Sequence, residues 1–306
     1  MSNSDSAPAT AGDASVTRPH KWLSLGRIWA LASSTFTHLV RMKVFYFLII
    51  FIAVIFGVGF LFVSLSFEQE LKLLKDVAFG AMYWFSTIFA IVGTAILIPR
   101  DVEDRTLYTI LSKPVPRFEY LIGKLLGVLL LVGVSLLAMD LIFSGILYFR
   151  QSTLLSYAAL NSDPEAASQM TEMIRAQGHS WDLQAVVFSI FLMASVLASV
   201  SMLLSTFATS TMFTIVMGFA VFMIGHGQAL ARNYFLQGET TGAVDRLITV
   251  GLAILFPDLQ LFNLVDGVAS GESIPFNLLL RITGIALLYV IIYNFIAYLI
   301  FSAKEL

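Results

Sequence analysis

Cysteine is absent from this chain of 306 residues, and charged residues are scarce. The absence of cysteine excludes disulfide bonds, thiolate metal sites and cysteine nucleophiles. Asp, Glu, Lys and Arg make up 12% of the residues, whereas a soluble domain carries about 25%. The net charge of −2 provides no general attraction to nucleic acid. Because 58% of the residues are apolar, the composition indicates an all-α, polytopic membrane protein.

Motifs for catalysis and nucleotide binding are also missing from the sequence. It contains no GxxxxGK[ST] phosphate loop, no HExxH zinc motif and no GxSxG nucleophile motif. We therefore expect no catalytic residue, no metal site and no cofactor in this chain. Met170, Met173 and His179 leave open a weak soft-metal site, but two methionines and one histidine make a poor ligand set. Packing by flexible methionines is the favoured interpretation.

Six apolar stretches are long enough to cross a bilayer. They predict membrane spans at about residues 44–65, 77–98, 121–149, 183–204, 212–231 and 278–301. Residues 1–22 form a polar tail that we expect to be disordered and cytoplasmic, and residues 23–306 are expected to form a single transmembrane domain. The third span exceeds the required ~20 residues, so we expect it to tilt or to project from the bilayer.

Shorter segments connect these spans. Residues 23–40 alternate apolar and polar faces at helical spacing and predict an amphipathic helix on the membrane surface. Residues 67–76 are expected to form a short loop. A second amphipathic helix is expected between Asp163 and Gly178, with Ala167, Met170 and Ile174 on one side. Residues 247–256 are too short to cross and predict an interfacial or re-entrant segment.

Basic residues predict the orientation, because cytoplasmic segments are enriched in Lys and Arg. With the amino terminus inside, 11 of the 18 basic residues lie on inner segments. These are Arg18, Lys21, Arg27, Arg41, Lys43, Arg100, Arg105, Lys113, Arg117, Lys124 and Lys304. The outer segments carry the remaining seven, which are Lys72, Lys75, Arg150, Arg175, Arg232, Arg246 and Arg281. We therefore expect both termini to be cytoplasmic.

The segment from Pro99 to Lys124 carries nine charged residues, more than any other passage between two spans. It predicts a short cytoplasmic helix that begins with three acids, Asp101, Glu103 and Asp104, at the positive end of the helix dipole. Leu107, Ile110 and Leu111 follow at helical spacing and form an apolar stripe. Pro114 and Pro116 end the helix. Such a stiff, partly apolar helix is suited to contact a soluble partner.

Two polar residues lie within predicted spans and leave alternatives open. Asp140 is an acid inside the third span, where acids are costly and often functional. Either it takes part in a structural pair with Arg281 or Arg150, which we favour, or it has a substrate or proton role. His226, between two glycines near the end of the fifth span, indicates a helix break or a gate, and we favour the break.

The Pro99–Lys124 segment resembles the first cytoplasmic loop of type-2 ABC transporter permeases. The likeness rests on Glu103-Asp104-Arg105-Thr106-Leu107, on Leu111-Ser112-Lys113-Pro114-Val115 with Arg117, and on Tyr120-Leu121-Ile122-Gly123-Lys124. The segments 32–43, 204–207 with 224–226, and 257–259 with 262–263 resemble further parts of the family in the same order. Within the family, the chain looks closest to the multicopper-enzyme-maturation, or nitrous-oxide-reductase, permease branch.

This resemblance implies a six-span permease of a bacterial inner membrane that acts as an exporter and forms a homodimer or pairs with a related permease. Two copies of a separate ATPase subunit would bind ATP and Mg, and the loop helix would dock on them. The residues then implied in coupling are Asp101, Glu103, Asp104, Arg105, Thr106, Leu107, Leu111, Lys113, Pro114, Pro116 and Arg117. An ion-coupled secondary transporter and a non-transporting membrane scaffold remain the alternatives.

Overall fold

The computed structural model describes residues 24–41, 45–61, 67–103, 116–160, 164–176, 178, 180–208, 210–237, 256–269, 271 and 273–303. Every regular element within these residues is a helix. The elements are α1 (Leu25–Arg41), α2 (Phe45–Leu61), α3 (Phe67–Glu103), α5 (Arg117–Ala159), α6 (Pro164–Ala176), α7 (Trp181–Phe207), α8 (Thr211–Gln237), the 3-10 helix η1 (Leu259–Phe262), α10 (Val265–Ala269) and α11 (Phe276–Ala303). The all-α membrane fold predicted from composition is confirmed.

Five of the described helices, α3, α5, α7, α8 and α11, are long and apolar enough to cross a membrane. α2 corresponds to the first predicted span, and its 17 described residues carry no charged side chain. Helices are the expected solution because hydrocarbon supplies no partners for exposed backbone groups. α7 lies at the centre, in contact with α3, α5, α8 and α11. Its many Ala and Ser residues let neighbouring backbones approach closely.

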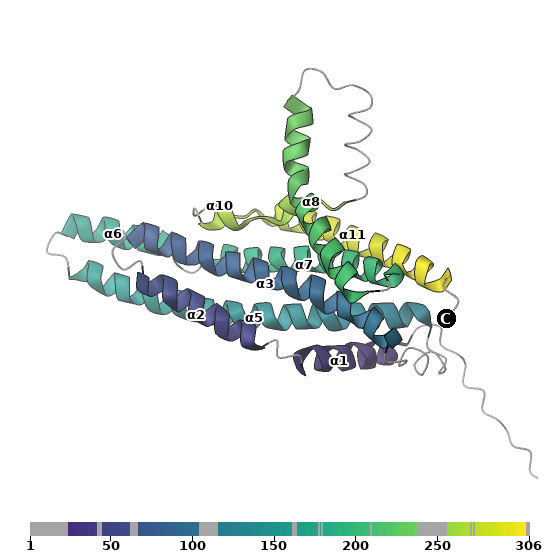
Figure 1. Cartoon of the computed structure of the whole chain (residues 1–306). Helices are drawn as coiled ribbons and strands as arrows, with labels where there is room; N and C mark the ends of the chain where they lie inside the picture. Colours follow the sequence, from purple (N-terminus) through teal and green to yellow (C-terminus); the bar gives the residue numbers. More distant parts are fainter. Residues whose placement is uncertain are drawn as a thin grey trace, which may run out of the picture.

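The bundle has two distinct ends (Figure 1). α1 lies along the beginning of α5, at the same end as the close of α11, whereas α6 lies at the opposite end. The predicted amphipathic helix after Asp163 is confirmed as α6, since Ile174 is buried and Met170 packs against the core. Met173 and His179 lie outside the residues whose side chains are described, as do residues 247–255.

Two boundary predictions were wrong. Residues 67–76 are the first turns of α3 and not a loop, because they contain no Gly or Pro and place Leu71, Leu74 and Ala78 on one buried face. Asp101 and Glu103 end α3, which continues through Pro99, and do not start a separate helix. Membrane helices tolerate proline when neighbouring groups compensate for the missing bond.

The predicted break at His226 was also wrong, because α8 is one continuous helix from Thr211 to Gln237. Figure 1 shows that α8 bends, so that its second half leaves the direction of the bundle. Farther along the chain, η1 contacts α8 and α7. Gln228 Nε2 donates to the Phe256 carbonyl at 2.8 Å, and the Ile274 amide donates to Asp182 Oδ1 at 2.8 Å.

α5 is longer than the predicted third span at both ends. Its 43 residues correspond to about 64 Å at 1.5 Å per residue, which confirms that it projects beyond a bilayer about 30 Å thick. α7, α8 and α11 match the fourth, fifth and sixth predicted spans and extend each of them by a few residues.

Candidate functional site at the root of the 104–115 loop

The predicted coupling loop enters from α3 and leaves into α5. Residues 104–115 lie outside the described residues. Seven residues of the predicted coupling set fall within this range: Asp104, Arg105, Thr106, Leu107, Leu111, Lys113 and Pro114. Of Glu103, the helical backbone is described. Asp101, Pro116 and Arg117 are described with their side chains. We call Asp101 together with Arg117, Glu119, Tyr120 and Lys124 the loop root.

Asp101 connects the end of α3 to the beginning of α5. Lys124 Nζ lies 2.7 Å from Asp101 Oδ2, and the Tyr120 hydroxyl donates to the same oxygen at 2.5 Å. An acid at the carboxyl end of a helix is unfavourable with the helix dipole. The charge-assisted bonds from Lys124 and Tyr120 offset this effect. Tyr120 is fully buried, so the two helices are joined at a fixed point.

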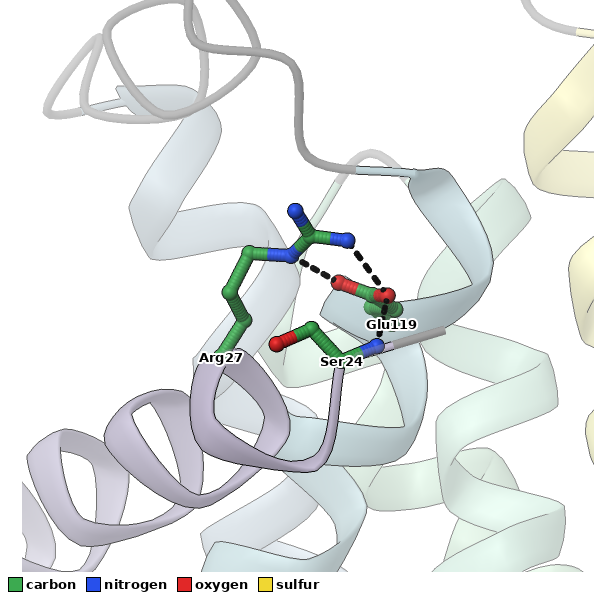
Figure 2. Close-up of polar contacts among 3 residues, drawn as sticks. All are labelled: Ser24, Arg27 and Glu119. Atoms are coloured by element: carbon green, nitrogen blue, oxygen red, sulfur yellow. Dashed lines mark hydrogen bonds and ion pairs between the residues drawn. The ribbon is translucent and has the colours of Figure 1, made fainter. Parts of the chain in front are cut away.

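Glu119 connects α5 to the beginning of α1 (Figure 2). Arg27 donates Nε to Oε2 at 2.6 Å and Nη2 to Oε1 at 2.8 Å. The Ser24 backbone amide donates to Oε1 at 2.8 Å, so the carboxylate also satisfies a free amide at the positive end of α1. The Glu119 side chain is fully buried. Its hydrogen bond to Arg27 raises the pKa of the guanidinium above the usual value.

Two glycines let α1 lie directly on α5. A Cβ at Gly123 would lie 2.6 Å from Leu31 Cβ, and one at Gly127 would lie 2.5 Å from Thr35 Cβ and 2.8 Å from the Ala32 carbonyl. The two glycines are four positions apart in the sequence, so they share one face of α5, as in the GxxxG motif of packed membrane helices. On α1, the buried residues recur at the same helical spacing: Ile28, Ala32, Thr35 and Leu39.

Arg117 connects the beginning of α5 to the end of α11. Its Nη1 donates to the carbonyls of Phe301 at 3.0 Å and Ser302 at 2.7 Å, which are free acceptors at the negative end of α11. The Tyr120 ring stacks on Phe301 with 5.8 Å between centroids, and Phe118 meets Tyr298 edge-on at 5.6 Å. The loop root therefore joins α1, α3, α5 and α11.

Sequence analysis identified two of the loop-root residues, Asp101 and Arg117, as site residues and missed the other three. Glu119, Tyr120 and Lys124 were noted as part of the charged segment or of the family pattern, without a role. The GxxxG spacing at Gly123 and Gly127 is a local signal that could have indicated the α1 contact. The partners on α1 and α11 are distant in sequence, and no local pattern identifies them.

The two polar residues within the spans have neutral partners. Asp140 is buried, and Gln184 Nε2 of α7 donates to its Oδ1 at 3.2 Å, whereas Arg281 is exposed on α11. The predicted pairing of Asp140 with Arg281 or Arg150 stays a prediction. Tyr83 of α3 is hydrogen-bonded to His226 Nε2. His226 Nδ1 lies 3.1 Å from the Phe222 carbonyl, which can only accept. Nδ1 therefore carries the proton and Nε2 accepts from Tyr83.

Replacing Asp140 with leucine should lower the melting temperature, because it leaves the half-buried Gln184 amide without its acceptor. The cost is about 1–3 kcal/mol, or several degrees for a chain of this size. Asp140→Asn keeps an acceptor oxygen and should have a clearly smaller effect. Thermal unfolding of the purified variants in detergent measures both. A normal melting temperature in Asp140→Asn combined with loss of pH-dependent activity would indicate a proton role instead.

Comparison with known protein families shows which family the chain belongs to. The family model described as ABC-2 family transporter protein matches residues 29–306, which is nearly the whole sequence. A search of curated proteins found no significant match. The family consists of non-catalytic membrane subunits of ABC transporters that generally pair with an ABC ATPase subunit. The multicopper-enzyme-maturation branch stays a prediction. The apolar helices and the family match together identify the chain as a multi-pass membrane permease of the ABC-2 transporter family.

Proposed function

We propose that this permease is the membrane subunit of an ATP-driven exporter and receives motion from a separate ATPase subunit through the loop between α3 and α5. ATP and Mg are bound by that partner and not by this chain. Two ATPase copies serve two permease copies, arranged as a homodimer or as a pair with a related permease. The cytoplasmic membrane of a bacterium is the proposed location.

The observation that supports this proposal is the construction of the loop root. A force on the loop reaches Asp101 on one side and Arg117 on the other. Asp101 is bonded to Tyr120 and Lys124, and Arg117 is bonded to the end of α11. Since Glu119 is bonded to α1, displacement of the loop moves four helices together. Interfaces this closely packed respond by rigid-body shifts and not by gradual deformation.

Orientation follows from the same end of the molecule. The end of α3, the beginning of α5, α1 and the close of α11 share this end (Figure 1), and Arg27, Arg117 and Lys124 of the predicted inner segments lie on these elements. We therefore place this end in the cytoplasm, together with both termini. An ATPase that hydrolyses cytoplasmic ATP can reach the loop in this orientation.

Replacing both Leu107 and Leu111 with aspartate should abolish co-purification of the ATPase subunit. The two leucines form the apolar stripe of the predicted loop helix, and two charges in a docking contact leave desolvated acids without partners. Leu160→Asp is the matched control, because Leu160 is 78% exposed and follows the far end of α5. Affinity purification of the tagged permease from membranes, with the ATPase co-expressed, measures the outcome.

Membrane insertion must be normal in the double variant for this result to count, and fluorescence-detected size exclusion checks it. ATPase recovery equal to that of the wild type would contradict docking through this loop. Recovery lost in Leu160→Asp as well would show that the effect arises from any added charge.

A further inference from the structure

α8 rests against the bundle along one narrow side. Within Thr211–Gln228, 28% of the residues are buried, compared with 83% of the most apolar stretch of α7. The buried residues recur at helical spacing and form one face, which packs against α3 and α7. They are Thr214, Gly218, Val221, Phe222 and Gly225. Because the bonds of the loop root join α1, α3, α5 and α11, the contacts of this narrow face decide whether α8 moves with those helices.

Buried hydroxyl groups line the place where α3, α7 and α8 meet. A Cβ at Gly218 would lie 2.6 Å from Ile91 Cγ2 of α3 and 3.3 Å from the Ser201 hydroxyl of α7. Ser205 follows one turn after Ser201 on the same side of α7. Thr214, which bonds to the Ser210 carbonyl of its own helix at 3.3 Å, lies one turn before Gly218. We call Ser201, Ser205 and Thr214 the hydroxyl seam.

The hydroxyl seam is not fully satisfied in the closed bundle. Ser201 and Ser205 are each 1% exposed, and neither hydroxyl has a hydrogen-bond partner in the described part of the chain. Burying a hydroxyl without a partner costs free energy, which contact with water would recover. The closed arrangement of α8 on α7 is therefore weakened along the hydroxyl seam, and another contact must hold it.

The bond between Tyr83 and His226 is such a contact. The Tyr83 hydroxyl of α3 donates to His226 Nε2 of α8, and the two rings meet edge-on with 5.7 Å between centroids. The Phe222 ring, one turn earlier on α8, lies 4.5 Å from the His226 ring. Tyr83 is about 27 Å along α3 from Asp101 by helical rise. α3 therefore carries the loop root at one end and the bond to α8 farther along.

α8 is also bound to the segment after Phe256, next to the bend seen in Figure 1. A Cβ at Gly225 would lie 2.7 Å from the Pro257 carbonyl oxygen, so only a glycine lets the two backbones approach this closely. Gln228 Nε2 donates to the Phe256 carbonyl at 2.8 Å. This part of α8 and the segment that follows Phe256 can therefore move as one unit.

We propose that the Tyr83–His226 bond is a clasp that holds α8 closed against α3 and α7, and that its release opens the hydroxyl seam. The mechanical part of this inference rests on the proposed function. Displacement of the loop moves α3 together with α1, α5 and α11, so the strain falls on the bond that joins α3 to α8. In the open form, Ser201 and Ser205 gain water as a hydrogen-bond partner.

A single cysteine can report the opening, because the chain contains no cysteine of its own. Ser201→Cys places a thiol in the hydroxyl seam, and its rate of reaction with N-ethylmaleimide is measured on the purified full-length chain in a neutral detergent. Adding Tyr83→Phe should raise this rate about fivefold, since it removes one hydrogen bond and leaves His226 Nε2 without its donor. His226→Leu should act similarly, and the two together should be clearly less than additive.

Ser199→Cys is the matched control on the opposite side of α7. Ser199 is fully buried, and Asn294 Nδ2 of α11 donates to its hydroxyl at 3.2 Å. Tyr83→Phe should leave the reaction rate of this thiol unchanged. Equal acceleration of both thiols would show a general loosening and would overturn the clasp. An unchanged rate at Ser201→Cys in the folded clasp variants would also overturn it, and two variants keep the test decisive if one fails to fold.

A second measurement separates the clasp from the proposed function. In the complex with the ATPase subunit, ATP and vanadate should accelerate the reaction of Ser201→Cys and not that of Ser199→Cys. Acceleration by Tyr83→Phe without any effect of ATP would support the clasp and contradict the proposed transmission from the loop. Acceleration by ATP without any effect of either clasp variant would support the transmission and overturn the clasp.

Discussion

Replacing Gly127 with alanine should weaken the packing of α1 on α5 and lower the melting temperature of the permease by about 5 °C. The new Cβ would lie 2.5 Å from Thr35 Cβ and 2.8 Å from the Ala32 carbonyl. The carbonyl belongs to the backbone of α1 and cannot turn aside, so the whole helix must move. Overpacking of this kind costs about 1–3 kcal/mol, which corresponds to several degrees in a chain of this length.

Gly145 supplies the matched control in the same helix. A Cβ at Gly145 has nothing within 4 Å, and alanine favours a helix over glycine by up to about 1 kcal/mol. Gly145→Ala should therefore leave the melting temperature unchanged or raise it slightly. Equal melting temperatures of Gly127→Ala and Gly145→Ala would show that the close contact between α1 and α5 does not contribute to stability. The proposal that motion of the loop reaches α1 through the loop root would then lose its support.

Replacing Glu119 with alanine should release the beginning of α1 and make Arg27 accessible to trypsin. The substitution removes the acceptor of three hydrogen bonds, two from the Arg27 guanidinium and one from the Ser24 amide. A buried carboxylate that satisfies three donors cannot be replaced by water without a rearrangement. We expect cleavage after Arg27 to accelerate at least about tenfold, because proteolysis follows the population of the open form.

Glu165→Ala is the control for Glu119→Ala, since Glu165 is exposed on α6 at the opposite end of the bundle. Its cleavage rate should equal that of the wild type. Because Arg27→Ala would remove the cleavage site, the coupling is measured by thermal unfolding. The effects of Glu119→Ala and Arg27→Ala should then be clearly less than additive in the double variant. Full additivity would show that the two residues stabilise the permease independently.

ATPase coupling provides a second readout of the same contacts. In Glu119→Ala the docking loop itself is unchanged, so the ATPase subunit should still co-purify. Motion of the loop would no longer reach α1, so stimulation of ATP hydrolysis by the permease should fall. This pattern differs from that of the Leu107 and Leu111 variant, in which binding itself is lost.

Composition and the spacing of apolar residues were sufficient to predict the helical membrane fold and the amphipathic helix α6. The reason is that a bilayer provides no hydrogen-bond partners, so long apolar stretches must form helices. Predictions from local sequence patterns were wrong where segments predicted to be separate belong to one helix. The charged residues 67–76 and the acids Asp101 and Glu103 resemble a loop and a helix start, yet they extend α3.

The tertiary structure alone decided which groups meet at the loop root. Arg27 and Glu119 are 92 residues apart, and Arg117 and the Phe301 carbonyl are 184 apart. The spacing of apolar residues over a few turns shows which face of a helix is buried. Which other helix covers that face depends on how helices that are distant in sequence pack together. The same limit applies to Lys75, which the sequence places among outer basic residues and the folded bundle encloses, because burial is a property of the neighbours that packing brings together.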